Sequence, residues 1–83
     1  MHFVKEILQV EPFKIKLRFE DGAIRELQFE NKLRSWANSE GSIYKQLLIP
    51  DNFLQVKLNN ELETIQWNNG IDFCPDMLYE WSK

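Results

Sequence analysis

The sequence has 83 residues, of which 43% are hydrophobic and 13% aromatic, and its formal net charge is −3 at pH 7. This length predicts a single domain, residues 1–83, with a thin core, and the composition excludes a disordered tail. No apolar run could span a membrane, and Lys5 and Glu6 interrupt the N-terminal apolar stretch where a signal peptide would need continuity. The lone cysteine excludes an internal disulfide, so we expect a cytoplasmic protein.

Residues 3–10 predict a strand, although their apolar side chains do not alternate strictly. A helix remains an alternative, because Val4, Ile7 and Leu8 have helical spacing. The connection through Pro12 to the next segment is very short, which favours two antiparallel neighbours. Proline also suits the start or edge of a strand, since it lacks a backbone donor.

Residues 13–19 give the clearest pattern, with apolar side chains at odd positions and charged side chains at even positions. This alternation predicts a half-buried strand, followed by a second strand after the turn at 20–22. A three-residue loop there pairs Phe13 with Phe29 and Ile15 with Leu27, whereas a two-residue loop would pair apolar with polar residues. We therefore expect the three-residue loop, with Gly22 in the left-handed conformation, Lys16 opposite Glu26, and Arg25 reaching toward an edge.

The central segment predicts short helices and a second hairpin. Leu33, Trp36 and Ala37 have helical spacing, and a second helical turn in 42–48 should end before Pro50. Residues 39–42 read as a loop. Alternating residues 54–58 predict a strand, a turn at 59–61 follows, and Ile65 and Trp67 face inward on the return strand.

The C-terminal segment predicts a turn and a helix. Asn68-Asn69-Gly70 is a turn sequence, and Pro75 suits the first helical position. Either Asp72 or the Cys74 backbone should lie near the exposed amides of the helix start. Leu78 and Trp81 share a helix face. The whole pattern predicts an α+β fold, with a small antiparallel sheet of about five strands, a short C-terminal helix and short central helical turns.

Two motifs carry a family resemblance. The turn contributes Phe19, Asp21 and Gly22, and the ending contributes Thr64, Ile65, Trp67, Asn69, Gly70, Asp72, Pro75, Leu78 and Tyr79. Together they resemble the small bacterial domain-of-unknown-function family 2442, over nearly the whole chain and most loosely in 30–42. The resemblance implies an α+β fold and no assigned activity. Some members look fused to a helix-turn-helix domain, for which this sequence is expected to end too early. Others are encoded beside a second small protein, an arrangement similar to that of toxin–antitoxin pairs.

Catalytic, metal and cofactor sites are not indicated. Cys74 precedes a helix start, which can activate a thiol, but we expect a small buried residue. His2 is the single histidine, and the chain offers no convincing set of zinc ligands. Asp72 and Asp76 are more typical of helix-start acids than of a catalytic pair. We therefore expect no enzyme and no cofactor.

Lys14, Lys16 and Arg18 form a cationic stripe on one sheet face. Phe13 and Phe19 point to the opposite face, so the stripe lacks the interleaved aromatics of a single-strand binding surface. A solvated face is the simpler interpretation, and the acidic net charge disfavours nucleic acid as a partner.

The aromatic residues suggest a protein interface, because a domain this small cannot bury three Trp and two Tyr completely. The candidate interaction surface is the C-terminal turn and helix together with the exposed edge of the sheet. Its named residues are Trp67, Asn69, Gly70, Asp72, Tyr79 and Trp81. Our hypothesis is a non-enzymatic protein-binding module, in its finer form the antitoxin-like member of a two-gene pair, with homo-oligomerisation left open. The alternatives are a nucleic-acid-associated regulatory domain, with Arg25 joining the stripe, and a small-ligand site beneath the Trp67–Gly70 turn.

Overall fold

The computed structural model describes residues 2–38 and 41–82. The strands are β1 (Val4–Glu11), β2 (Lys14–Phe19), β3 (Ile24–Gln28), β4 (Lys57–Asn59) and β5 (Thr64–Gln66). The helices are α1 (Glu30–Trp36), the 3₁₀ helix η1 (Ile43–Leu48), α2 (Pro50–Phe53) and α3 (Pro75–Trp81). The predicted α+β fold is confirmed, and its antiparallel strands divide into a sheet β1-β2-β3 and a hairpin β4-β5.

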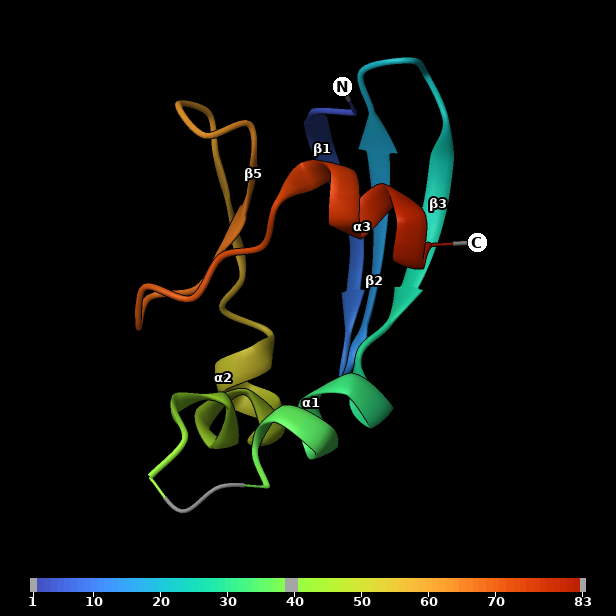
Figure 1. Ribbon diagram of the computed structural model, residues 1–83. Coiled ribbons are helices and arrows are strands. Elements are labelled where there is room, and N and C mark those ends of the chain that lie inside the picture. The colour runs from blue at the N-terminus through green and yellow to red at the C-terminus, as the bar shows by residue number, and fades with distance from the viewer. Residues whose placement is uncertain (1, 39–40, 83) are drawn as a thin grey trace.

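Figure 1 shows how these elements are arranged. The β4-β5 hairpin stands beside the three-stranded sheet, α3 crosses in front of the sheet, and α1 and α2 gather at one end. None of the helices in the described ranges is both long and apolar enough to cross a bilayer.

The β2-β3 register is the one that the alternation predicts. Ile15 lies opposite Leu27 and Lys16 opposite Glu26. The three-residue loop is confirmed, because the Phe19 amide donates to the Ala23 carbonyl at 2.9 Å. Gly22 has a φ of 86°, a left-handed conformation that glycine adopts without steric cost.

β1 is a strand, and its irregular apolar spacing has a structural cause. The β1-β2 pairing shifts register twice, between Val4 and Glu6 and between Ile7 and Gln9. Each bulge adds one residue to β1 and changes the local repeat from two residues to three. As a result, every third residue faces inward: Val4, Ile7 and Val10 lie opposite Phe19, Leu17 and Ile15.

The predicted strand at residues 54–58 is wrong in its first half. Phe53 ends α2, Leu54 and Gln55 form a turn, and β4 begins only at Lys57. Pro50 both limits η1 and starts α2, because its fixed φ suits the first position of a helix. The helical turns predicted around residues 31–37 and in 42–48 are present as α1 and η1. Ser39 and Glu40 of the predicted loop lie outside the described residues.

Four aromatic rings join the two sheets in one core. The ring of Phe29, which follows β3, has its centroid 5.8 Å from Phe53, 6.1 Å from Trp67 and 5.6 Å from Phe73. Phe29 and Phe53 are completely buried. Because these residues come from three separate regions of the chain, the cluster ties the helices and the hairpin to the three-stranded sheet.

The variant Phe29→Ala should lose about 3–5 kcal/mol of unfolding free energy, because it removes the ring shared by these aromatic contacts. Urea titration followed by tryptophan fluorescence would measure the loss. The exposed Ile24→Ala serves as the control and should stay within about 0.5 kcal/mol of the parent. Equal midpoints for the two variants would contradict the central role of this ring.

Candidate functional site

Trp67 belongs to the core and not to the predicted interaction surface. Its side chain is 3% exposed, and its indole Nε1 donates to the Phe53 carbonyl at 2.9 Å. The prediction that Trp67 offers a contact surface is therefore corrected. A buried indole that finds a backbone acceptor is a structural anchor.

Asn69 and Gly70 shape the turn after β5. The Asn69 side chain accepts from the Ile71 amide at 3.1 Å and donates to Gln46 Oε1 at 3.0 Å, which ties the turn to η1. Gly70 has a φ of 90°. The Trp67 amide donates to the Ile71 carbonyl at 2.8 Å and closes the turn. Both residues are exposed, yet their side-chain and backbone geometry serves the turn.

The entry to α3 follows one of the two predicted arrangements. Cys74 occupies the N-cap without a side-chain hydrogen bond, whereas Asp72 forms an isolated bridge with Gln66. Cys74 is exposed, so the expectation of a buried thiol is wrong. The burial alternates here, because Phe73 enters the core and turns its neighbour outward.

Thr64 fixes the same segment from the hairpin side. Its side chain is buried, and Oγ1 donates to the Phe73 carbonyl at 2.6 Å. The hydroxyl therefore satisfies a carbonyl that lies beside the aromatic core. This contact holds the β5 strand to the chain that leads into α3.

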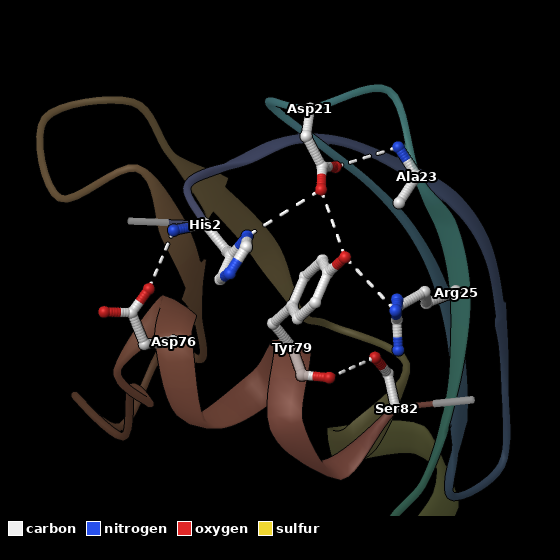
Figure 2. Close-up of polar contacts among 7 residues, drawn as sticks. All are labelled: His2, Asp21, Ala23, Arg25, Asp76, Tyr79 and Ser82. Atoms are coloured by element: carbon white, nitrogen blue, oxygen red, sulfur yellow. Dashed lines mark hydrogen bonds and ion pairs between the residues drawn. The ribbon is translucent and has the colours of Figure 1, made fainter.

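Tyr79 closes α3 onto the three-stranded sheet (Figure 2). Its ring lies between the His2 imidazole, stacked with centroids 3.6 Å apart, and the Arg25 guanidinium, whose Cζ is 4.0 Å from the ring centroid. The phenol donates to Asp21 Oδ2 at 3.1 Å and accepts from Arg25 Nη2 at 3.1 Å. The ring edge also packs on Phe19 at a centroid distance of 4.9 Å.

The Asp21 carboxylate is the acceptor at the centre of this contact. Its Oδ1 accepts from the Ala23 amide at 2.9 Å, and His2 Nδ1 lies 3.8 Å from Oδ2. The Ala23 hydrogen bond lowers the pKa of Asp21 below 3.8, and the Tyr79 hydroxyl and the charges of His2 and Arg25 lower it further. Asp21 thus stays ionised and holds both the turn and the helix.

The two motifs of the sequence therefore meet in space. Phe19 and Asp21 of the turn contact Tyr79 of the ending, and the other motif residues described above form the core, the turn and the helix entry. Sequence reasoning missed that His2, Asp21 and Arg25 surround Tyr79. The presence of both Asp21 and Tyr79 in the motifs was the signal that could have linked them.

A surface hollow of about 650 Å³ lies between β3 and the ends of α1 and α3. We call it the β3 groove; its lining includes Ile24, Arg25, Glu26, Gln28, Lys32 and Trp81. Trp81 packs on Trp36 and Phe73, while Lys32 Nζ lies 5.4 Å from the centroid of its indole ring. Of the predicted surface residues, Trp81 is the one that lines this groove, whereas Ile24 and Lys32 went unnoticed in the sequence.

The cationic stripe of β2 is a mixed surface. Arg18 pairs with Glu6 at 3.0 Å, and Lys14 Nζ lies 3.5 Å from the carboxylates of both Glu11 and Glu26. Glu26 and then Glu11 raise the pKa of Lys14. Since acids from both neighbouring strands offset these cations, the stripe does not form a continuous phosphate track.

Two hollows flank the Trp67–Gly70 turn, where a small-ligand site was considered. The one on the hairpin side, about 630 Å³, is lined mainly by polar side chains, with Leu58 and Trp67 as its apolar members. The other holds about 110 Å³. Ligand sites are mostly apolar and larger than the second hollow, so neither has the character of such a site. In the described residues, no group of three His, Cys, Asp or Glu side chains could hold a metal ion.

The variant Tyr79→Phe should raise the pKa of Asp21 but leave it below 3.8, because the larger contribution of the Ala23 hydrogen bond remains. NMR titration of the Asp21 carboxyl carbon would measure the pKa of Asp21 in the parent and in the variant. Tyr44→Phe is the control and should leave the pKa of Asp21 unchanged. Because the native pKa is lowered, the stability that Asp21 contributes is present above pH 3.8 and is lost as the pH falls through the native value. An unchanged titration in Tyr79→Phe would contradict the contact.

The variant Thr64→Val should lose about 1–3 kcal/mol of unfolding free energy, because it leaves the buried Phe73 carbonyl without its donor. Thr64→Ser keeps the hydroxyl and should lose less. Urea titration of the two variants separates the contribution of the hydrogen bond to stability from that of the methyl group. A larger loss in the serine variant would show that packing, not the hydrogen bond, dominates at this position.

Comparison with known proteins identifies a family and a similar fold. No curated protein matches the chain significantly. A crystal structure of "Putative DNA Binding Protein NE0471" from Nitrosomonas europaea ATCC 19718 matches with a TM-score of 0.78 and 17% identity, over 98% of this chain and 48% of that one. The chain thus spans about half of that protein, and the likeness shows the fold alone. A family model described as "Protein of unknown function (DUF2442)" matches residues 4–83, and this chain therefore belongs to the DUF2442 family.

Proposed function

We propose that this chain is a non-enzymatic, cytoplasmic module that binds another protein through the β3 groove. The observation that carries the proposal is the side chain of Ile24, which is 57% exposed on the edge strand of the sheet. Among the described residues it is the most exposed large hydrophobic side chain, and it lines the same hollow as Trp81. Apolar and aromatic residues that share a hollow are typical of interface anchors.

The finer form of the proposal concerns the partner. Some members of the family that this chain resembles are encoded beside a second small protein, so the product of a neighbouring gene is the first candidate. In that arrangement the chain would act as the antitoxin-like member. Support for this form comes from the resemblance, and the groove supplies a surface on which such a partner could dock.

A nucleic-acid-associated role is the second candidate. The similar structure is described as a putative DNA-binding protein, and Lys16, Arg25 and Lys32 line the β3 groove beside Trp81. Against it stand the net charge of −3 and the ion pairs of Arg18 and Lys14. Binding of DNA or RNA that weakens steeply with added salt would favour this candidate over the first.

The test of protein binding uses two matched surface variants. Ile24→Asp places a charge in the β3 groove and should weaken binding of the purified neighbouring-gene product by more than about tenfold. Ile49→Asp is the control, because Ile49 is 53% exposed but does not line that groove. Isothermal titration calorimetry measures both affinities. Absence of binding by the parent chain, or equal loss in the two variants, would overturn the proposal.

A further inference from the structure

We propose that the β3 edge binds an extended, acidic segment of the partner as an additional strand. This inference rests on the proposed function and specifies the chemistry of the segment bound. Recognition by strand addition uses main-chain hydrogen bonds for affinity and alternate side chains for specificity. Such recognition requires an open row of backbone groups on β3 and charges that favour an acidic segment over a second copy of the chain.

The hydrogen-bond pattern fixes which backbone groups of β3 face outward. The Phe19 amide donates to the Ala23 carbonyl at 2.9 Å, and the Phe29 amide donates to the Phe13 carbonyl at 2.7 Å. Ala23 and Phe29 therefore direct their backbone groups toward β2 or its extension. In an antiparallel ladder such residues alternate with residues whose groups point the other way.

The alternation leaves three outward positions on β3. Ile24, Glu26 and Gln28 direct their N–H and C=O groups away from β2, and all three residues line the β3 groove. They form a regular row, because the β2-β3 register has no shift along its length. An added strand can pair with this row without disturbing the existing sheet.

The opposite edge of the sheet is less receptive. β1 carries two bulges, and its Val4 amide already donates to the Glu63 carbonyl at 2.9 Å. The β4-β5 hairpin stands on this side of the sheet (Figure 1). Bulges and covering elements are the usual protection of an edge strand. β3 is therefore the edge on which a partner segment can pair.

The charges around the β3 groove favour an acidic segment. Lys16, Arg25 and Lys32 line it, and none of the three forms an ion pair within the described residues. The one carboxylate in the lining, Glu26, lies 3.5 Å from Lys14 Nζ. The groove thus carries net positive charge on a protein whose overall charge is negative.

The side chains of an added strand would alternate between two environments. One face of the strand would lie beside Arg25, on the side that α3 covers, and would meet Lys32 and Trp81. The other face would meet the exposed Ile24. The fitting segment therefore alternates acidic residues, toward Arg25 and Lys32, with apolar residues toward Ile24.

The same charges disfavour pairing between two copies of this chain. A symmetric antiparallel β3-β3 contact would place Arg25 of one copy diagonally across the joined edge from Arg25 of the other, on the same face of the extended sheet. Like charges across such an interface are destabilising. A partner with carboxylates removes this repulsion, so the acidic segment is the better occupant.

The test uses a short peptide of alternating Asp and Val residues, with a peptide of alternating Lys and Val as the control. NMR spectra of the ¹⁵N-labelled chain should shift at the amides of Ile24, Glu26 and Gln28 and at the Trp81 indole when the acidic peptide is added. The Lys-Val peptide should bind at least about tenfold more weakly, or about 1.4 kcal/mol. Lys32→Glu should reduce this preference.

A matched pair of variants isolates the backbone contribution. Glu26→Pro removes an outward N–H from an edge strand, where proline is tolerated, whereas Glu26→Ala removes the same carboxylate and keeps the N–H. Binding of the acidic peptide should persist in the alanine variant. In the proline variant the affinity should fall by about tenfold, because one main-chain hydrogen bond to the peptide is lost and about 1.4 kcal/mol corresponds to a tenfold change in dissociation constant. The NMR spectrum of each free variant confirms that the fold is intact.

Three results would overturn the inference. The first is absence of the predicted shifts at millimolar peptide concentrations, and the second is equal peptide binding by the two Glu26 variants. The third is self-association of the chain that Glu26→Pro abolishes, because that result would assign the β3 edge to a second copy. If the neighbouring-gene product binds Glu26→Pro as tightly as the parent, strand addition fails while the proposed protein-binding function stands. If the parent binds neither that protein nor the peptide, both fail.

Discussion

The stacking of Phe73 on Phe29 is the contact on which the rest of the molecule depends. A two-stranded hairpin such as β4-β5 is marginally stable alone, and a three-stranded sheet needs cover on its apolar face. Phe73 leads into α3 and also contacts Trp67 and Trp81. The same ring therefore joins the hairpin to the sheet, positions the helix that covers the sheet, and sets the wall of the β3 groove.

The polar residues of the family motifs form hydrogen bonds that hold separate segments of the fold together. Asp21 and Tyr79 connect the β2-β3 turn to α3, Thr64 holds the segment before α3, and Asn69 closes a turn. In the part of the chain that the structure describes, no buried side-chain nitrogen or oxygen atom is left without a partner. A motif rich in Asp, Asn, Thr and Tyr can suggest chemistry, yet here each of these four side chains has a hydrogen-bond role within the chain.

Local periodicity was enough to predict the β2-β3 hairpin, because one buried face and one loop length leave a single register. It was not enough for Leu54, which fits an alternating pattern but lies 40% exposed after α2. The fixed φ of Pro50 and the burial of Phe53 favour the helix α2 there, so the strand begins later. The inward orientation predicted for Trp67 on the return strand is confirmed, although Trp67 was also placed on the candidate interaction surface. The pattern could not reveal the exposure of Cys74 or assemble the β3 groove, because these depend on packing between segments distant in sequence. Tyr79 and Trp81, which were placed on the candidate interaction surface, are partly exposed.

The two bulges of β1 have a consequence for assembly. They twist one edge of the sheet and leave β3 as the regular one, so the sheet can be extended in a single direction. An open filament of copies would need β1 of one copy to pair with β3 of the next. The bulged β1 disfavours this head-to-tail pairing.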